Sequence, residues 1–565
     1  MRTVRWSAGV AAVALAIIGA YLFTLDHDAL VRLVGRVSGY GKLDKISGQL
    51  TGVRSLLVRS APILMAGMFA FCAWKPRIIL VPISRVAEAF RYGRAVALDV
   101  WRIMPLWERW TFRLLLLGSL MVHGWYAITA PAHVDEAMTW LLFSSRGPLV
   151  AWTFYAAPNN HLLHSLFTTV TNWLPVEPLL AIRVPTVLIA LCAQAVLHLM
   201  LRRLTNAFAT LIAISLAIGS YPLLYYGYVS RGYMLVFFSF VLAYGATILV
   251  MRTGDRRAML LLTLSCAMGM FTMPSFLYAA GLLFAFAFLH VPTGNSRVYR
   301  GSLFASGVLL VIITAAFYLP AIAMSGLAAF TSNKWVKPTG RMDVLAHWWP
   351  HFSSTFNWIT GTAYGFLVVA VVVIGAWLTA PSRRGIVLLN VFLLTGSLLI
   401  PFAHGVIPFE RTWIHLIVPI TVCAALLIRP IGAWKRSKPW MGIAIAIALL
   451  FGLIVRFERV LPEQEYMAFS ARTMFQAVRT VEPQDIYCEF VVMGDHLFFD
   501  LQSRGIPATI VHSPEGIERA SHLSEPVYSL LIVREAAPVN DPNYRELYAD
   551  DIQRVYVRRD LHPGE

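Results

Sequence analysis

Thirteen mostly apolar stretches of 16 to 23 residues recur along this 565-residue chain. A helix rises about 1.5 Å per residue, so about 20 apolar residues cross the ~30 Å hydrocarbon layer of a bilayer. Only 14% of the residues are charged, against about 25% in soluble domains. This excludes a water-soluble globular enzyme and predicts a polytopic α-helical membrane protein with about 13 transmembrane helices. The predicted spans are 7–25, 61–83, 112–130, 179–201, 207–226, 234–251, 258–273, 275–290, 302–324, 364–380, 385–401, 412–428 and 440–456.

Basic clusters between these stretches predict the orientation of the chain, because Lys and Arg concentrate in cytoplasmic loops. When the spans alternate across the membrane, the clusters share one face, and the N-terminus is predicted to be cytoplasmic. They are Arg202-Arg203, Arg252 with Arg256-Arg257, Arg297 with Arg300, Arg383-Arg384, and Lys435-Arg436 with Lys438. The segments 131–178, 227–233, 325–363 and 402–411 then lie outside. Residues 26–60 fit poorly, because they should be external and yet are basic; an interfacial amphipathic helix there is the alternative.

The tail, residues 457–565, differs from the rest of the chain in charge. It contains 10 Lys and Arg against 18 Asp and Glu, whereas the preceding 456 residues contain 37 against 12. Helical periodicity over 463–481 and strand-like runs at 486–493, 508–512, 527–533 and 552–557 predict a small external α/β domain. We therefore divide the chain into an N-terminal extension (1–111), a transmembrane domain (112–456) and this tail. The basic excess lies in short clusters between spans, so nucleic acid is not an expected partner.

Carboxylates are scarce before residue 457, and none lies in the middle of a predicted span. Ion-coupled transporters usually need such groups, so transport is disfavoured. The adjacent pair Asp135-Glu136 follows the outer end of span 112–130, just after Pro131. Partial desolvation there is expected to raise the pKa of a carboxylate and make it a better general base. The alternative is that both acids only begin the next helix, predicted over 137–145.

Two further motifs lie in the first long outer loop and at the mouth of a later span. Asn159, Asn160 and His161 are suited to hydrogen-bonding a sugar or phosphate, and His161 with His164 could bind a metal, although two ligands are weak evidence. Arg231, in the Tyr-rich run before Tyr233, lies at the outer end of a predicted span, although Lys and Arg concentrate on the cytoplasmic side. The alternatives are a hydrogen-bonded helix start for the first motif and, for Arg231, snorkelling to the headgroups.

Three other basic residues are candidates for holding a lipid phosphate. Arg411 opens a late span, and Lys334 and Lys337 lie in the outer loop 325–363 beside Trp335. At about 4 Å and an effective dielectric constant near 20, one charge pair is worth roughly 4 kcal/mol before desolvation. Arg411 could instead pair with Glu410 or snorkel, and the loop could be an ordinary aromatic belt.

Together these motifs resemble the C-type (GT-C) fold of membrane glycosyltransferases, in particular family 39 and its bacterial relatives. Those relatives are protein O-mannosyltransferases, aminoarabinose transferases and galacturonosyl transferases. The resemblance covers about residues 112–456. It rests on Asp135-Glu136, on Pro158-Asn159-Asn160-His161, on Arg231-Gly232-Tyr233 and on Glu410-Arg411, in this order and on one face.

The resemblance implies a polyprenyl-phosphate sugar as donor and an envelope glycan, lipid or protein as acceptor, on the outer face of a bacterial inner membrane. It makes Asp135 the general base and Glu136 a positioning or assisting residue. Arg231, Arg411, Lys334 and Lys337 become donor-phosphate candidates, and Asn159, Asn160, His161 and Tyr233 substrate-binding candidates. A lipid phosphate leaves as a stabilised anion, so one base should suffice and the anomeric carbon should invert; a glycosidase needs a second carboxyl group.

The chain departs from the family pattern at one point, and two alternative functions remain. Some relatives have a second acid before the Arg-Gly-Tyr-like motif, where this chain has only Tyr and Ser, so we expect no obligatory metal and no other cofactor. A polymerase or ligase of lipid-linked oligosaccharides is a second enzymatic interpretation. A flippase, or a glycan-assembly partner without transferase activity, is the non-enzymatic one.

Overall fold

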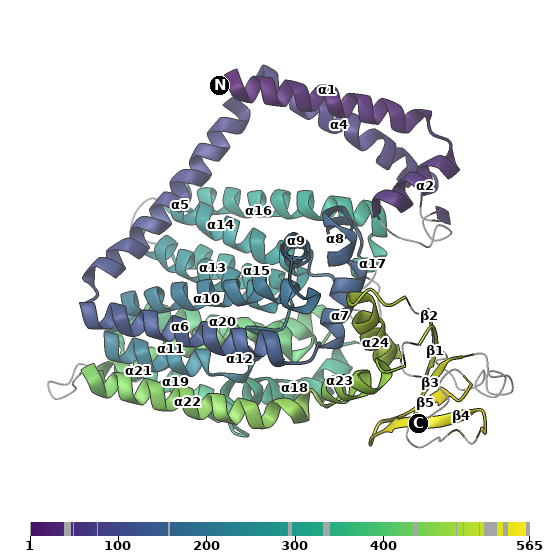
Figure 1. Ribbon diagram of the computed structural model, residues 1–565. Coiled ribbons are helices and arrows are strands. Elements are labelled where there is room, and N and C mark those ends of the chain that lie inside the picture. Colours follow the sequence, from purple (N-terminus) through teal and green to yellow (C-terminus); the bar gives the residue numbers. More distant parts are fainter. Residues whose placement is uncertain are drawn as a thin grey trace.

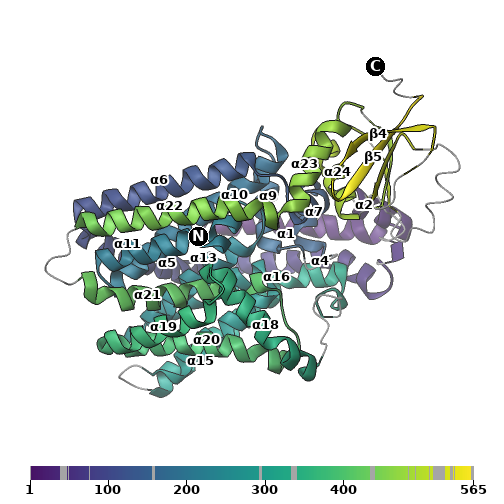
Figure 2. The same ribbon diagram turned by 90° about the horizontal axis from the view of Figure 1, so that it is seen from below.

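The computed structural model describes residues 2–38, 47–48, 50–75, 77–155, 159–291, 296–331, 340–432, 439–481, 483–489, 491–507, 509–512, 528–534, 539 and 541–560. Most of the chain is helical, and the long helices lie side by side as a bundle with a small sheet at one end (Figures 1 and 2). The expected polytopic α-helical architecture with a small C-terminal α/β unit is therefore present.

Within these residues, eight helices are long and apolar enough to cross a membrane, or nine if one bent pair counts as a span. The predicted count of 13 is therefore not confirmed. Six of the eight are single helices: α1 (Arg2–Thr24), α6 (Leu106–Thr129), α10 (Pro178–Leu204), α13 (Tyr233–Thr253), α16 (Ser296–Ser325) and α22 (Pro439–Gln464). The other two each join a 3-10 helix to an α-helix: η3 (Pro381–Arg383) with α20 (Arg384–His404), and η4 (Glu410–Leu416) with α21 (Ile417–Gly432).

The other predicted spans are interrupted helices. Span 207–226 divides into α11 (Ala207–Ile218) and α12 (Tyr221–Tyr226), because Gly219 and Ser220 separate them. The predicted spans 258–273 and 275–290 are separate helices on either side of Pro274, since proline is a poor continuation of a helix: α14 (Arg256–Thr272) comes before it, and η2 (Pro274–Phe276) and α15 (Leu277–Leu289) follow. The bent pair is α18 (Arg341–Thr360) and α19 (Gly365–Thr379), which meet at 70°.

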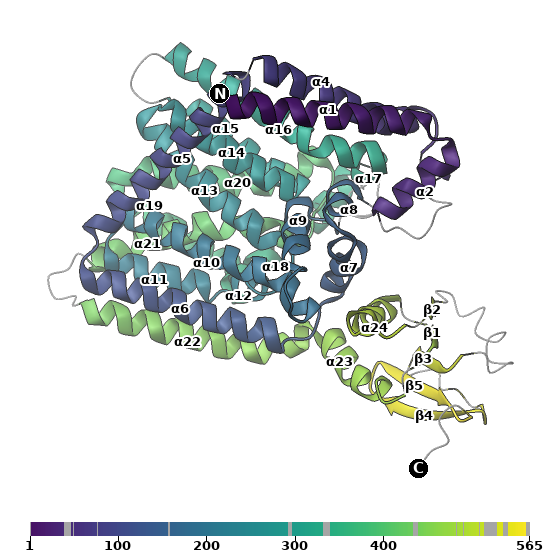
Figure 3. The same cartoon turned by 45° about the horizontal axis from the view of Figure 1, so that its top comes forward.

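The N-terminal region forms a helix pair joined to the bundle by a long amphipathic helix. In Figure 1, α1 and α4 (Val53–Trp74) run antiparallel beside the bundle, with the short amphipathic α2 (His27–Ser38) between them in sequence. The helix α5 (Arg77–Ile103) then runs across the ends of the bundle helices to reach α6 (Figures 1 and 3). Predicted span 61–83 is therefore wrong in its boundaries, because the chain leaves α4 at Trp74 and turns into α5.

The bundle has two chemically different ends. At one end, which we call the arginine end, lie the predicted clusters Arg202-Arg203, Arg252, Arg256-Arg257, Arg297 with Arg300, and Arg383-Arg384. The sheet and the segments that carry Asp135 and Arg231 lie at the other end, which we call the sheet end (Figure 1). The cluster Lys435-Arg436 with Lys438 lies outside the described residues.

The C-terminal region contains a five-stranded sheet in the order β2-β1-β3-β5-β4. Its strands are β1 (Asp485–Cys488), β2 (Thr509–His512), β3 (Leu530–Arg534), β4 (Tyr544–Ala549) and β5 (Gln553–Arg558). The strand β1 is parallel to β2 and β3, whereas β5 is antiparallel to β3 and β4. Helices α23 (Tyr466–Val478) and α24 (Val491–Ser503) share a hydrophobic core with the sheet.

This α/β unit docks against a short helix that begins the outer loop. Helix α7 (Val134–Leu142) packs on α24, where Phe499 joins Ala137, Leu141 and Ile182 in one buried cluster (Figures 1 and 3). After α7 come η1 (Ser144–Arg146), α8 (Pro148–Thr153) and α9 (Leu162–Thr171), and α17 (Ala328–Thr331) follows α16. The α/β unit thus supports the helix that presents Asp135 and Glu136.

Candidate active site

A cavity of about 520 Å³ opens at the sheet end, and we call it the site cavity. It is formed by the start of α7, the segment between α12 and α13, the start of η4 and the end of α22. Its polar and aromatic lining is His133, Asp135, Tyr221, Tyr225, Tyr226, Arg231, Tyr233, His351, Trp358, Phe409, Glu410, Arg411, Gln464 and Glu465. The structure therefore brings Asp135, Arg231, Tyr233 and Arg411, which come from three parts of the sequence, into one cavity.

Asp135 and Arg231 form an ion pair in this cavity. The Arg231 Nη2 atom lies 3.2 Å from Asp135 Oδ2, and the Arg231 side chain is only 4% exposed. Its Nε and Nη1 atoms are buried and have no hydrogen-bond partner among the described residues. A buried donor without a partner costs roughly 1–3 kcal/mol, and more when it is charged. A cation this deep is not snorkelling to headgroups.

Arg411 is the second cation of the site cavity. Its guanidinium lies 4.3 Å from the ring centre of Phe409 and 5.8 Å from that of Tyr233, and the Arg231 guanidinium is also 5.8 Å from Tyr233. No ion pair between Arg411 and Glu410 is formed in the described structure, and the buried Nε atom of Arg411 has no hydrogen-bond partner there. Tyr233 therefore lies between two cations that both line the cavity.

The charge state of Asp135 differs from the sequence-based expectation. Burial favours the neutral carboxyl group, but the positive charges of Arg231, His133 and Arg411 outweigh it, and the pKa of Asp135 is lowered. The expectation that desolvation would raise this pKa is therefore wrong, because it omitted the cation that the fold places 3.2 Å away. Asp135 is ionised at neutral pH and is held by Arg231.

Glu136 does not line the site cavity, although it is adjacent to Asp135 in sequence. It is fully buried against Arg183 of α10: Arg183 Nε donates to Oε1 at 2.9 Å and Nη2 to Oε2 at 2.6 Å. The Arg183 guanidinium also donates to the backbone carbonyls of Ala130 and Pro131, at 2.9 and 2.8 Å. Burial favours the neutral carboxyl group, but Arg183 and the backbone N–H groups of Ser230 and His133 together outweigh it, so the pKa of Glu136 is lowered. Its place fits a positioning role and does not allow contact with substrate.

The Glu136–Arg183 pair helps to position Asp135 and Arg231. Glu136 accepts hydrogen bonds from the backbone N–H of His133 at 3.0 Å and from that of Ser230 at 2.6 Å. His133 caps the start of α7, where its Nδ1 atom accepts from the Asp135 N–H. One buried carboxylate therefore fixes the residue preceding Arg231 and the helix turn that holds Asp135.

The Asn-Asn-His motif forms the start of α9 and does not line the site cavity. Asn160 is buried, donates to the carbonyls of Ala151 and Phe154, and accepts from the Ser165 hydroxyl. Its hydrogen-bonding groups are thus used within the protein, so this geometry does not support Asn160 as a substrate ligand. The side-chain oxygen of Asn159 is buried without a partner in the described part of the chain.

His161 lies behind the cavity wall, with its ring centre 5.2 Å from that of Tyr233. Burial, together with the charge of Arg231, lowers the pKa of His161 well below its usual range, so the ring is neutral. A Cβ atom on Gly232 would approach the His161 Cβ atom to 2.7 Å, so a glycine is required where the two segments meet. His164 forms a hydrogen bond with Thr186.

Among the described residues, no group of three or more His, Cys, Asp or Glu side chains could hold a metal. Lys334 and Lys337 lie outside the described residues.

Sequence reasoning missed two residues that matter to the site. Glu465 lines the cavity at the junction of α22 and α23; it accepts from the Tyr225 hydroxyl at 2.6 Å and lies 3.8 Å from His133 Nε2. Burial raises the pKa of Glu465. It lies nine residues beyond residue 456, where the census of acids in the transmembrane region ended. Arg183 stands near the outer end of span 179–201, and a charge at that place was the available signal.

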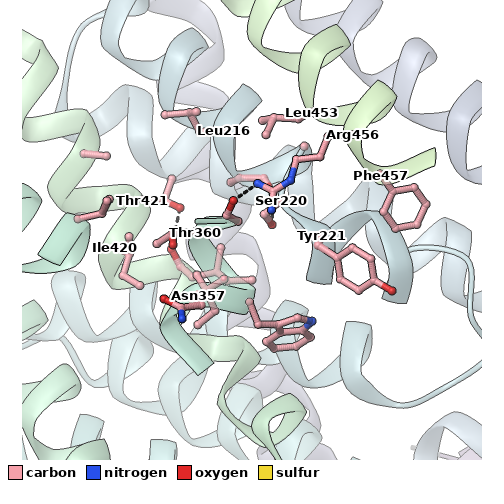
Figure 4. A pocket seen from close by; sticks show the side chains of 18 of the residues that line it. Leu216, Ser220, Tyr221, Asn357, Thr360, Ile420, Thr421, Leu453, Arg456 and Phe457 are labelled. Carbon is pink, nitrogen blue, oxygen red and sulfur yellow. Dashed lines mark hydrogen bonds between the residues drawn. The ribbon is translucent and has the colours of Figure 1, made fainter. Parts of the chain in front are cut away.

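A second cavity of about 430 Å³ adjoins the first and shares Tyr221, Trp358, Glu410 and Gln464 with it. Helices α11, α18, α19, α21 and α22 form its walls, and most of the lining is apolar. Figure 4 shows Leu216, Ile420 and Leu453 around it, with Arg456 bonded to the Gly361 carbonyl. An apolar space therefore opens beside the charged one.

Comparison with solved structures identifies the fold. The chain is similar to ArnT from Cupriavidus metallidurans in the apo state, with a TM-score of 0.56 and 12% identity over 80% of this chain and 99% of ArnT. It is similar to the same protein bound to undecaprenyl phosphate, with a TM-score of 0.51 and 13% identity over 80% of this chain and 99% of ArnT. This likeness confirms the C-type glycosyltransferase fold predicted from the sequence.

No family model matches the chain, and no curated protein matches it.

Proposed function

We propose that this protein is a membrane glycosyltransferase, which moves a sugar from a polyprenyl-phosphate carrier to an acceptor of the cell envelope. The acceptor would be a glycan, a lipid or a protein, and the reaction would occur at the sheet end, on the outer face of a bacterial inner membrane. The observation that carries this proposal is Arg231, a buried cation with two unpartnered donor atoms, paired with the carboxylate of Asp135 in an open cavity.

The two arginines suit the phosphate of the donor. Guanidinium groups bind phosphate through pairs of N–H donors, and such charge-assisted bonds are about twice as strong as neutral ones. Arg231 offers Nε and Nη1, and Arg411 offers Nε, in one cavity. The resemblance to ArnT, which has been solved with undecaprenyl phosphate, supports a polyprenyl phosphate as the anion.

The second cavity suits the lipid part of this donor. Its walls are mainly apolar and come from membrane-spanning helices, and it shares four residues with the site cavity. A prenyl chain that entered there would place its phosphate near Arg411, because Arg411 follows the shared residue Glu410 in the sequence. One carrier would thus occupy both cavities, with the charged group in one and the apolar chain in the other.

The proposed reaction needs one base and two cations. Asp135 accepts the proton of an acceptor hydroxyl group, whose oxygen attacks the anomeric carbon as the bond to the phosphate oxygen breaks. The electron pair of that bond leaves with the polyprenyl phosphate, whose added charge Arg231 and Arg411 stabilise. The attack comes from the face opposite the phosphate, so the anomeric configuration inverts. The steps proposed here do not use a metal ion.

The ion pair also suggests how the base is made ready. In the free protein Arg231 lowers the pKa of Asp135, which makes the carboxylate a weak base. A bound phosphate competes for the same guanidinium and adds negative charge, and both effects raise the basicity of Asp135. The base would therefore become strongest only when the donor is present, which disfavours proton transfer in an empty site.

Transfer by Asp135→Asn in membranes supplied with labelled polyprenyl-phosphate sugar tests this proposal. Losing a general base typically costs 10²–10⁴ in rate, so we expect transfer to fall by at least about a hundredfold. The matched control is Asp343→Asn, which changes an acid on α18 that does not line the site cavity. Full transfer by Asp135→Asn would reject the assigned base. Movement of lipid-linked sugar across the membrane without transfer, in the wild type, would favour a flippase instead.

A further inference from the structure

A groove of about 370 Å³ lies at the arginine end, away from both cavities described above. We call it the α5 groove, because α5 forms one wall and α10, α13 and α14 form the others. Its lining is almost wholly apolar, with residues such as Val100, Val196, Leu242 and Leu261. Helices α10 and α13 are long and apolar enough to span the membrane, so the groove opens among membrane-embedded segments.

Helix α5 has the character of a helix that lies in the membrane interface. It runs across the ends of the bundle helices in Figures 1 and 3, rather than parallel to them. Gly93, Val96, Ala97 and Val100 face the groove at helical spacing, whereas Arg85 and Arg91 are exposed elsewhere on the helix. An amphipathic helix of this kind lies at the boundary of headgroups and acyl chains. The mouth of the groove is therefore expected at the level of the lipid phosphates.

Two arginines without ion-pair partners stand at this groove. Arg94 of α5 and Arg203 of α10 both line it and are exposed, and neither forms an ion pair within the described structure. Arg252 lies within electrostatic range of Arg203 and of Arg383. Of the acids near this end, Glu108 pairs with Arg202, Asp255 with Arg257 and Asp99 of α5 with Arg102. The remaining acid of α5, Glu88, lies within electrostatic range of Arg257. The groove thus combines an apolar interior with uncompensated positive charge at its edge.

We propose that the α5 groove binds one anionic phospholipid, with an acyl chain in the groove and the phosphate between Arg94 and Arg203. The apolar walls match an acyl chain and the cations match an anionic headgroup. A zwitterionic lipid would bring an ammonium group close to Arg203, Arg252 and Arg383, which disfavours it. Bound lipid would also fill the space between α5 and the bundle, and would thus fix the helix that connects the N-terminal pair to α6.

The dimensions favour a phospholipid over a polyprenyl phosphate at this place. The groove extends from Val196 to Leu204 along α10, about 12 Å at 1.5 Å per residue. That is less than the ~15 Å thickness of one hydrocarbon leaflet. An acyl chain can enter over this depth while the second chain stays in the bilayer. A polyprenyl chain would leave most of its length outside, and the cavities suited to it lie at the other end of the bundle.

Native mass spectrometry of the purified full chain tests this inference, with phosphatidylglycerol and phosphatidylcholine as probes. We expect one tightly held phosphatidylglycerol per chain, bound at least tenfold more tightly than phosphatidylcholine. Arg94→Gln combined with Arg203→Gln should weaken phosphatidylglycerol binding at least tenfold. Gly245→Leu should block it by filling the groove, since a Cβ atom on Gly245 meets only Met200 Sδ, at 3.8 Å.

Two controls separate this site from general lipid contact. Arg85→Gln removes an exposed charge from α5 outside the groove, and Gly281→Leu adds the same side chain where a Cβ atom has no neighbour within 4 Å. Both controls should bind like the wild type. Equal binding of the two phospholipids, retention of a polyprenyl phosphate in the groove, or unchanged phosphatidylglycerol binding by Gly245→Leu would each overturn the proposal. These results do not depend on whether the protein transfers a sugar.

Discussion

At the scale of single residues, the ion pair of Asp135 and Arg231 would link the charge state of the proposed base to the binding of the proposed anion. Arg231 is 4% exposed, and its Nη2 atom forms the ion pair with Asp135, while its Nε and Nη1 atoms have no hydrogen-bond partner in the described structure. The carboxylate is consequently ionised and restrained in the free protein. A phosphate that binds Arg231 would release it.

The pH dependence of kcat/KM reports on this pair. If Asp135 is the base, its ionised carboxylate is the active form. Arg231 lowers the pKa of this group, so the acid side of the profile should fall only below the ordinary aspartate pKa of about 3.9. In Arg231→Gln the opposing charge is lost, and the same fall should move to higher pH by about one to three pH units. If the fall on the acid side stays at the same pH in Arg231→Gln, this arginine does not control the pKa of Asp135.

The buried pair of Glu136 and Arg183 supports a prediction about stability. Removing one partner of a buried ion pair leaves an uncompensated charge, which typically costs 3–5 kcal/mol. We therefore expect Arg183→Met to lower the free energy of unfolding by about 3–5 kcal/mol, measured by thermal unfolding in detergent. The double variant Arg183→Met/Glu136→Leu should recover much of that stability and still lose transfer, because Ser230 and His133 lose their common acceptor. Equal losses in the single and double variants would contradict the pairing.

At the scale of elements, the short helix α7 connects the site to the C-terminal α/β unit. Its first turn carries Asp135, and its other face packs on α24 through Ala137, Leu141 and Phe499. Trp140 meets Phe499 edge to face, with ring centres 5.4 Å apart. The α/β unit also supplies Glu465, near the start of α23, to the lining of the site cavity. The position of Asp135 therefore depends on an element more than 350 residues away in sequence.

Phe499→Ala tests this dependence. Phe499 is 6% exposed, and truncation of a buried phenylalanine typically costs 3–5 kcal/mol. We expect the variant to loosen α24 from α7, which proteolysis within the tail would detect, and to reduce kcat several-fold while donor binding at Arg231 changes little. Phe304→Ala is the matched control, since Phe304 is 70% exposed on a membrane-length helix. An unchanged kcat in Phe499→Ala would show that the docking does not position Asp135.

Several elements were predictable from local pattern, and others were not. Pro274 marks a helix break without any knowledge of packing, and the runs that became β2, β3 and β5 carry enough β-branched residues to be recognised. The strand β4 was missed because Tyr544–Ala549 includes Arg545 and Glu546 and is only partly buried. Span 207–226 looked continuous because hydropathy does not register the change of direction at Gly219 and Ser220.

At the scale of the whole molecule, the fold brings together residues that no local pattern connects. Asp135, Arg231 and Arg411 were recognisable from the sequence, because a charge at the outer end of a span requires an explanation. The distances between them were not, and neither were the partners that Glu136 and Asn160 find inside the protein. Those depend on how α7, α9 and α10 pack, which is decided by long-range contacts. The direction of the pKa shift of Asp135 was mispredicted for the same reason.

The two ends of the bundle divide the molecule chemically. Unpaired arginines and the α5 groove lie at one end, and the site cavity with the α/β unit lies at the other. Under the orientation bias of membrane proteins, the arginine end is expected to face the cytoplasm. That places the proposed transfer on the outer face, where an apolar cavity beside the charged one can receive a carrier from the surrounding bilayer.

Equilibrium binding of a polyprenyl phosphate to the purified protein tests the central claim most directly, namely that Arg231 holds the donor phosphate beside the base. The account predicts at least tenfold weaker binding in Arg231→Gln, and equal or tighter binding in Asp135→Asn, because the competing carboxylate is gone. Arg85→Gln, which changes an exposed charge on α5, should bind like the wild type. Unchanged binding in Arg231→Gln, or loss of binding in Asp135→Asn, would contradict the account.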